Sequence, residues 1–468
     1  MHVLNVIFVM LEVVILFNLL IFVHELGHFL AARWRGLKID RFAIWFGKPI
    51  WKTKINGVEY ALGTIPAGGY VSLPQMAPME MIEGKPDPSH AGLPPISALD
   101  KIIVAFAGPL FSFGLALAFA VVVWQVGRPV TESETSTVIG LVHKDGPAEK
   151  AGMRRGDKVL AVDGQPVSKF GGMGDSISWR VVRSVAPTIP IEIERDGKPM
   201  TLTVEPRVEK TKAWQRKGLR QIMIEPAQSS IVAIVYSNSP AALAGMKPKD
   251  EVVEVNGVKP IHYTQMAEAL DQSQGKPLNL KVLRDGQTLT FNVQPVIPLK
   301  SPDEKKMPRI GIEWTDGGKT TISYPGPVEQ VASSVSAMIS TFGALFDRHS
   351  HVKVQQLGGA VKILSIYYVL FQHEQGWRLA LWFSVLMNVN LAVLNMLPFP
   401  VLDGGHITLA VVEAIRRRPI SAKLLNYVQT GCAVALISFM LYIAFYDVQD
   451  LRGRKSGEME FAPAAATK

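Results

Sequence analysis

The sequence is poor in cysteine and in charge. It holds one cysteine, Cys432, so no disulfide can form within the chain and zinc sites built from several cysteines are excluded. A metal ion would have to be held by His, Asp or Glu. Charged residues make up 19% of the 468 residues, where about a quarter is usual for a soluble protein. The formal net charge is +9, but the basic residues gather beside apolar runs, which indicates membrane topology rather than nucleic-acid binding.

Long apolar runs are abundant instead. Four segments approach the ~20 residues that span the hydrocarbon core of a bilayer: 3–23, 102–126, 379–397 and 424–446. The first lacks a basic leader and a small-residue cleavage motif, so we expect a retained span rather than a signal peptide. Basic residues cluster after the first span and between the third and fourth. The positive-inside rule therefore puts these short links in the cytoplasm, and residues 128–377 and both termini on the other side.

The stretch 140–167 recurs at 233–260. Both copies combine a strand, a short helix that opens at Pro147 or Pro240, an Ala-Gly-Met step and a strand that ends in an Asp-Gly or Asn-Gly turn. The pattern resembles two tandem PDZ domains, at 128–226 and 227–315, and PDZ domains bind extended peptide ends by adding a strand to a sheet edge. Segments 222–224 and 309–312 are candidate peptide grooves. The repeats can equally be spacers or steric gates without a peptide ligand.

The remaining segments complete the expected organisation. Apolar residues at helical spacing over 327–348 and 356–372 predict either interfacial amphipathic helices or linker helices packed on a repeat. We expect a polytopic α-helical membrane protein with four transmembrane helices, a membrane-associated β-sheet and two tandem PDZ (α+β) domains. Its expected parts are an N-terminal membrane half (1–127, first helix 3–32), the two repeats, a linker (316–377), a C-terminal membrane half (378–450) and a tail (451–468).

The run His24-Glu25-Leu26-Gly27-His28 lies at the end of the first span. On a helix, His24 and His28 project from one face, so both imidazoles can reach one ion at the ~2.0–2.1 Å suited to Zn²⁺. Glu25 points to another side and is placed to act as a general base on a water molecule. Two core histidines satisfied by neighbouring helices would show the same spacing. However, ionisable groups within a membrane span are expensive and usually functional.

Asp403 offers a third ligand after the third span. Prolines at positions 398 and 400 break the helix before it, and we expect the backbone to turn sharply at the Gly-Gly pair 404–405. Irregular backbone at membrane depth occurs where it is buried in protein or lines a wet cavity, so the break predicts a site between helices. His24, His28 and Asp403 with one water would form an open tetrahedral zinc site. Taken alone, Asp403 is more typical of a loop cap at the cytoplasmic surface, and it is the pairing with the His-Glu-x-x-His run that favours a metal ligand.

Residues 48–73 predict a hairpin around Asn56-Gly57, followed by a strand that contains Gly68-Gly69-Tyr70. Short strands beside basic residues can enter the membrane as a sheet whose edge captures an extended substrate. The alternative is an ordinary cytoplasmic hairpin, although no independent core accompanies it.

Together these motifs resemble the site-2 protease family. The resemblance rests on the His-Glu-x-x-His run, on Asn395-x-x-Pro398-x-Pro400-x-x-Asp403-Gly404 and on the PDZ-like repeats, and it covers nearly the whole chain. It implies a zinc metalloendopeptidase of the bacterial inner membrane, with its active site toward the cytoplasm. Its substrates would be single-pass membrane proteins: an anti-sigma factor of the envelope stress response, after a first cut outside the membrane, and remnant signal peptides. The resemblance also implies substrate-binding residues: Asn390, Asn395, Pro398, Pro400, Gly68, Gly69 and Tyr70.

Two other functions stay open from the sequence. A membrane-anchored PDZ scaffold with a structural or inactive metal site would bind peptides without cutting them. A transporter with a polar core would explain neither the repeats nor Glu25. For the protease, the expected partners are single-pass membrane substrates, peptide termini at the repeats and the lipid bilayer, with no nucleic acid.

Overall fold

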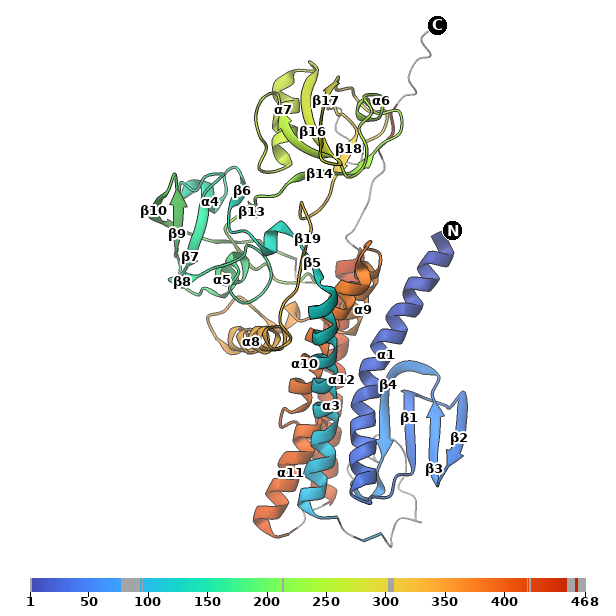
Figure 1. Ribbon diagram of the computed structural model, residues 1–468. Coiled ribbons are helices and arrows are strands. Elements are labelled where there is room, and N and C mark those ends of the chain that lie inside the picture. Colours follow the sequence, from blue (N-terminus) through green and yellow to red (C-terminus); the bar gives the residue numbers. More distant parts are fainter. Residues whose placement is uncertain are drawn as a thin grey trace. The chain divides into compact units, whose positions relative to one another are not determined.

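The computed structural model describes residues 2–76, 93–94, 96–212, 214–301, 307–418, 420, 422–452 and 459–461 (Figure 1). The chain forms two compact units. Unit 1 comprises residues 1–128, 323–339 and 357–448, and unit 2 comprises residues 129–322, 340–356 and 449–468. Most of the predicted tail, 451–468, lies outside the described residues.

Unit 1 is built on apolar helices: α1 (His2–Trp34), α3 (Ala98–Val126), α9 (Ala360–Phe371), α10 (Gly376–Asn395), α11 (Asp403–Arg416) and α12 (Ala422–Arg452). Within the described residues, 5 segments are long and apolar enough to cross a membrane. Four of them correspond to the predicted spans, and the additional one is Val354–Phe371. α3 packs against α1, α10 and α11. Its approach to α1 depends on Gly27, where a Cβ would lie 2.5 Å from the carbonyl oxygen of Ala107.

A four-stranded sheet follows α1, made of β1 (Arg41–Phe46), β2 (Trp51–Ile55), β3 (Val58–Leu62) and β4 (Ile65–Ser72). The strand order is β2-β3-β1-β4, with β1 and β3 parallel and the other neighbours antiparallel. The predicted hairpin forms between β2 and β3. Its turn residues, Asn56 and Gly57, have φ of 49° and 86°, as a type I′ turn requires. The edge strand β4 packs against α1 (Figure 1), and a 3₁₀ turn (Pro74–Met76) follows it.

In unit 2 the internal repeat gives two similar sets of elements, each around its own hydrophobic core. In both, the last strand pairs with the first: β13 with β6, and β18 with β14. The first set is β6 (Ile139–Val142), α4 (Pro147–Lys150), β7 (Lys158–Val162), β8 (Gln165–Pro166), α5 (Ile177–Arg183), β9 (Ile189–Arg195), β10 (Lys198–Val204) and β13 (Ile224–Pro226). The second set is β14 (Ser230–Val235), α6 (Pro240–Leu243), β15 (Glu251–Val255), α7 (Thr264–Ser273), β16 (Leu278–Arg284), β17 (Gln287–Val293) and β18 (Ile312–Trp314).

Short elements surround these sets. They are β5 (Arg128–Val130), β11 (Arg207–Val208), β12 (Arg220–Gln221), β19 (Thr321–Ser323) and the 3₁₀ turns Glu132–Glu134 and Val354–Gln356. β5 pairs with β19, and β11 pairs with β12. The long helix α8 (Pro327–Phe346) forms where helical spacing predicted it.

Both repeats share one ion pair that the sequence did not reveal. In the first, Arg195 donates from Nε and from Nη2 to the two oxygens of Asp157, each at 2.7 Å. In the second, Arg284 donates to Asp250 in the same way, at 2.6 and 2.7 Å. Each arginine also donates to the carbonyl of the glycine in the Ala-Gly-Met step. Because both carboxylates are buried, these bonds fix the turn after the short helix to the end of β9 in the first repeat and of β16 in the second.

Candidate metal centre

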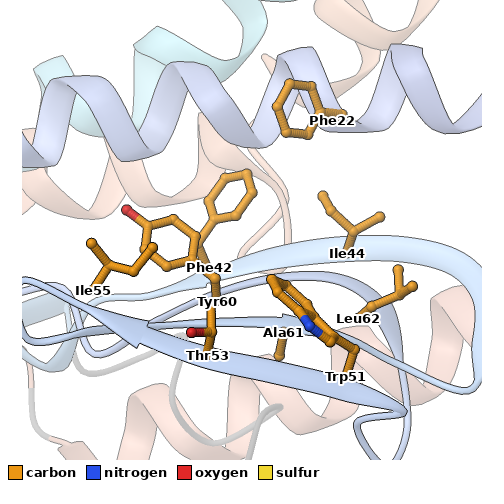
Figure 2. Close-up of a pocket in the computed structure, with 9 residues that line it drawn as sticks. All are labelled: Phe22, Phe42, Ile44, Trp51, Thr53, Ile55, Tyr60, Ala61 and Leu62. Atoms are coloured by element: carbon orange, nitrogen blue, oxygen red, sulfur yellow. The ribbon is translucent and has the colours of Figure 1, made fainter.

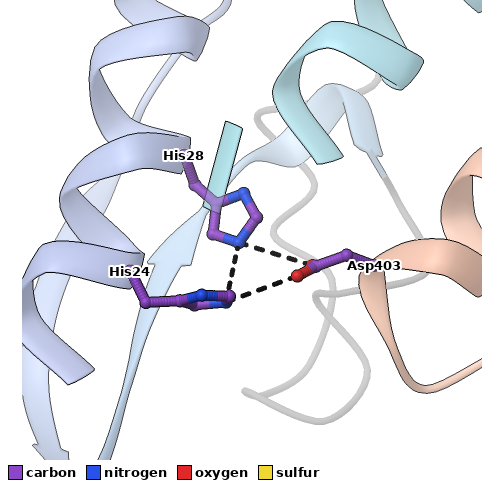
Figure 3. A group of neighbouring side chains, drawn as sticks. All are labelled: His24, His28 and Asp403. Atoms are coloured by element: carbon purple, nitrogen blue, oxygen red, sulfur yellow. Dashed lines mark hydrogen bonds and ion pairs between the residues drawn. The ribbon is translucent and has the colours of Figure 1, made fainter. Parts of the chain in front are cut away.

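His24 and His28 are buried on α1, and their rings lie edge to face with an interplanar angle of 84° (Figure 3). α3 fixes both rings. Nδ1 of His24 lies 3.0 Å from Oγ of Ser112, and Nδ1 of His28 lies 2.8 Å from the carbonyl oxygen of Val104. A carbonyl oxygen only accepts, so His28 carries its proton on Nδ1 and its Nε2 lone pair is free for a metal ion.

Asp403 reaches the histidines from the first turn of α11. The chain leaves α10 and forms an irregular link over residues 396–402 before α11 begins. We expected a turn at Gly404 and Gly405, but both are helical. Their missing side chains serve close packing instead, since a Cβ on Gly404 would lie 2.2 Å from the carbonyl oxygen of Met396. A Cβ on Gly405 would lie 2.0 Å from that of Phe399. The link therefore folds tightly against the start of α11.

The three side chains enclose a space of the size that a zinc ion needs. Oδ2 of Asp403 lies 3.3 Å from Nε2 of His24, and Oδ1 lies 3.4 Å from Nε2 of His28. The two Nε2 atoms are 3.3 Å apart. Ligand atoms held at ~2.0–2.1 Å around a tetrahedral ion stand roughly 3.3–3.4 Å apart. The two Nε2 atoms have this separation, and each of them has one oxygen of the Asp403 carboxylate at the same distance. Oδ2 of Asp403 is buried and accepts no hydrogen bond from the described residues, which leaves an acceptor that a cation would satisfy.

Gly108 of α3 leaves the room that His28 occupies. A Cβ at position 108 would lie 2.2 Å from Nε2 of His28 and 2.5 Å from its Cε1. The sequence analysis missed Val104, Gly108 and Ser112. The available signal was the pair Gly108 and Ser112, because small residues four apart in an apolar helix are typical of a close helix contact.

Glu25 and Asn395 lie beside the three ligands. Glu25 is half-buried, and the edge strand β4 passes against it, since a Cβ on Gly69 would lie 3.0 Å from Cγ of Glu25 and 3.3 Å from Cγ2 of Ile21. Asn395, at the end of α10, places its Nδ2 3.2 Å from Nε2 of His24. The site thus brings together a carboxylate, an amide that can donate, and the backbone of an edge strand.

Known proteins similar to this chain carry the names of metalloproteases or proteases. The sequence pattern of Peptidase family M50 matches residues 12–439. The chain belongs to peptidase family M50. A putative zinc metalloprotease from Neisseria meningitidis is 30% identical, over 93% of this chain and 97% of that protein. One from Treponema pallidum is 27% identical, over 93% and 97%. The regulator of sigma E protease from Salmonella typhimurium is 28% identical, over 94% and 98%.

The resemblance to the site-2 protease family is therefore confirmed. The family match begins before His24 and ends after Asp403, so it contains all three candidate ligands.

Two of the predicted substrate residues of this M50 chain lie away from the cluster. Asn390 is half-buried in α10, five positions before Asn395, and so on a different face of that helix. The hydroxyl of Tyr70 accepts a hydrogen bond from Nη1 of Arg41 at 3.0 Å. Because side chains alternate along a strand, Tyr70 points to the opposite side of β4 from Gly69.

The other predicted positions shape the backbone around the site. Gly68 has a φ of 72° and lies under the ring of Phe46, where a Cβ would come 1.9 Å from Cε2. Pro398 and Pro400 lie in the irregular link, and the carbonyl oxygen of Pro400 accepts a bond from Nε2 of Gln429 at 3.5 Å.

An apolar cavity of about 410 Å³ lies between α1 and the sheet (Figure 2). Phe22 faces it from α1, while the remaining lining residues stand on β1, β2 and β3, among them Trp51 and Ile55. No metal-centre residue lines it. The cavity is therefore separate from the candidate metal centre.

Proposed function

We propose that this M50 chain is an intramembrane zinc metalloendopeptidase that cuts the transmembrane segment of single-pass membrane proteins. The proposal is supported above all by the matching separations between the ligand atoms of His24, His28 and Asp403, with Glu25 beside them. His24, Glu25 and His28 belong to an apolar helix that is long enough to cross a membrane. The cut would therefore be made below the membrane surface.

The residues have separate roles in this proposal. Zinc, when held by His24, His28 and Asp403, supplies Lewis acidity toward the scissile carbonyl and lowers the pKa of water. Glu25 takes the proton from the attacking water and returns it to the leaving nitrogen. Asn395, whose Nδ2 lies 3.2 Å from Nε2 of His24, is close enough to donate a hydrogen bond to a substrate carbonyl.

The sheet supports the handling of a helical substrate. A transmembrane helix uses its carbonyls in its own hydrogen bonds, so the segment must be extended before it is cut. β4 is an edge strand whose backbone at Gly69 packs on Glu25, so a substrate strand added to this edge would run past the general base. Gly68 precedes Gly69, so two consecutive residues of β4 have no side chain to obstruct an added substrate strand. Tyr70, Asn390 and the proline link 398–400 remain proposed substrate contacts around this path.

The two repeats support tandem PDZ domains, at 128–226 and 227–315, that bind peptide termini or gate access to the membrane site. The segments proposed as grooves lie at equivalent places in the two copies. The carbonyl oxygen of Ile222 accepts from the backbone N–H of Ala148 at 3.1 Å, and that of Ile310 accepts from Ala241 at 2.9 Å. In each copy this contact is made at the short helix that opens at the repeated proline.

Four membrane crossings fit the contacts better than five. α9 has 12 residues and is about 18 Å long, short of the ~30 Å hydrocarbon core. It packs on α10, where Oγ of Ser384 lies 2.8 Å from the hydroxyl of Tyr367, as a helix that turns back would. Near the end of α12, Asp450 pairs with Arg216 at 2.9 Å, and both residues belong to unit 2. With the basic links in the cytoplasm, the repeats and both termini would lie in the periplasm, and the protein in the inner membrane.

The proposed substrate class follows from the relatives. The name of the Salmonella relative, regulator of sigma E protease, supports an anti-sigma factor of the envelope stress response as substrate, cut after a first cleavage outside the membrane. Remnant signal peptides are a second substrate of the same physical kind, since they too are single apolar helices.

One experiment tests the function. The purified chain, reconstituted in lipid, is incubated with a single-pass membrane peptide with and without a zinc chelator. We expect cleavage that the chelator stops, and Glu25→Gln should retain zinc but abolish cleavage. Glu12→Gln, which changes another carboxylate of α1 outside the metal centre, is the matched control and should cleave normally. Peptide binding without any cleavage would favour the membrane-anchored PDZ scaffold with a structural metal site.

A further inference from the structure

One face of α1 carries both the general base and the contacts with the sheet. Ile21 and Glu25 follow Asn18 by three and seven positions, a spacing that puts all three on one face of a helix. Asn18 then stands about 10 Å from Glu25 along the helix axis. Gly69 of β4 packs against Ile21 and Glu25, so the same face receives the edge strand.

Asn18 is bonded to an unusual residue of β1. Nε1 of Trp45 donates a hydrogen bond to Oδ1 of Asn18. The amide is oriented for this, because its Nδ2 donates to the carbonyl oxygen of Val14 at 2.7 Å. Trp45 has a φ of 69°, and the register between β1 and β4 shifts between Ile44 and Phe46. A non-glycine residue in the left-handed region is strained and persists only where its surroundings hold it. The hydrogen bond from Trp45 to Asn18 of α1 stabilises this conformation.

The bulge at Trp45 determines where β4 runs. Ile44 pairs with Gly69 before the bulge, and Phe46 pairs with Ile65 after it. The ring of Phe46 covers Gly68 so closely that a Cβ there would lie 1.9 Å from Cε2. The backbone that passes Glu25 is therefore set by the two residues on either side of Trp45.

We propose that the hydrogen bond between Asn18 and Trp45 is a positioning contact for proteolysis. It holds the bulge of β1, and through it the edge strand β4, at the level of α1 where an extended substrate meets Glu25. The inference rests on the proposed function. Asn18 and Trp45 act through the sheet, and the general base and the metal ligands do the chemistry.

A double-mutant cycle on the full chain in lipid tests the contact. Asn18→Ala and Trp45→Phe should each lower kcat about two- to tenfold, the size of one net hydrogen bond, while KM and zinc content stay unchanged. The double variant should be no slower than the slower single variant. Product mass spectra give the second measurement. Cuts at bonds next to the principal one should increase, because a loosened sheet can present the substrate in more than one register.

A matched control separates positioning from general structure. Tyr367→Phe removes a buried hydrogen bond between α9 and α10, away from the sheet, and should leave the cut position unchanged. The proposal is overturned if Asn18→Ala cleaves with the parent kcat, or if it slows cleavage while its product pattern matches that of Tyr367→Phe. Absence of cleavage by the parent chain would instead count against the proposed function itself, so the two failures are distinguishable.

Discussion

Gly108→Ala should remove the metal ion while leaving the protein folded. The added Cβ would lie 2.2 Å from Nε2 of His28, whereas ordinary contact begins near 3.4 Å, a deficit of 3.4 − 2.2 = 1.2 Å. The imidazole cannot swing away freely, because its Nδ1 is bonded to the carbonyl oxygen of Val104 at 2.8 Å. A metal site tolerates deviations of about 0.2 Å in its bond lengths. A displacement several times larger takes His28 out of reach of the ion.

The fold should survive the same change. Overpacking of a core by one methyl group costs about 1–3 kcal/mol. Replacement of a helical glycine by alanine contributes about 0.5–1 kcal/mol in the opposite direction. The net loss is small beside the total stability of a domain, about 5–15 kcal/mol. Loss of metal without unfolding is therefore the expected result.

Gly114→Ala is the matched control for Gly108→Ala. Gly114 lies in the same helix, six residues further along α3, and a Cβ there would meet no heavy atom of the described residues within 4 Å. Zinc per chain is measured by elemental analysis of the purified proteins, and folding by thermal unfolding in detergent. Cleavage of a membrane peptide gives the third measurement. If Gly108→Ala bound one zinc ion per chain and cut like Gly114→Ala, the assignment of His28 as a ligand packed against α3 would be refuted.

Two predictions concern unit 2. Asp157→Asn removes one partner of a buried ion pair and should destabilise the first repeat by about 3 kcal/mol, measured by denaturant unfolding. Asp250→Asn should destabilise the second repeat in the same way. Unchanged unfolding midpoints would contradict the importance of these ion pairs. Burial lowers the pKa of His262 below its ordinary value. The folded state then binds fewer protons than the unfolded state below about pH 6.5, so stability should fall as the pH drops from there, and His262→Gln should lessen that fall.

The ligand set was accessible from the sequence because each part of its signal is local. Two histidines four apart lie on one face of any helix, so His24 and His28 need no tertiary information to be paired. The prolines before Asp403 mark a helix end for a reason that is also local, the missing N–H and the clash with the preceding turn. The hairpin at 56–57 was accessible in the same way, because Asn-Gly accepts the positive φ at both turn positions.

The supporting contacts were not accessible, because they depend on which helix faces which. Gly108 and Ser112 mark a close helix contact, but the role of Gly108 exists only once α3 lies against His28. The order of the sheet is likewise non-local, since β1 precedes the hairpin yet pairs in parallel with its second strand. Gly404 and Gly405 show a second reason why a structural role could not be predicted from the sequence. A Gly-Gly pair suits a sharp turn and close packing equally well, and here the structure uses it for packing inside a helix.

The glycines also explain how a membrane site of this kind can be held in place with few polar bonds. At Gly27, Gly108, Gly404 and Gly405 an added Cβ would lie 2.5 Å or less from backbone or from a ligand ring. At Gly69 it would lie 3.0 Å from Cγ of Glu25. Each missing side chain lets one element approach another at van der Waals distance. In lipid the hydrophobic effect does not drive helices together, so dispersion between closely packed surfaces becomes a main attraction. The geometry of the candidate metal centre is therefore set by close packing. Adding a methyl group at any one of these glycines should disturb the site more than removing most of its polar contacts.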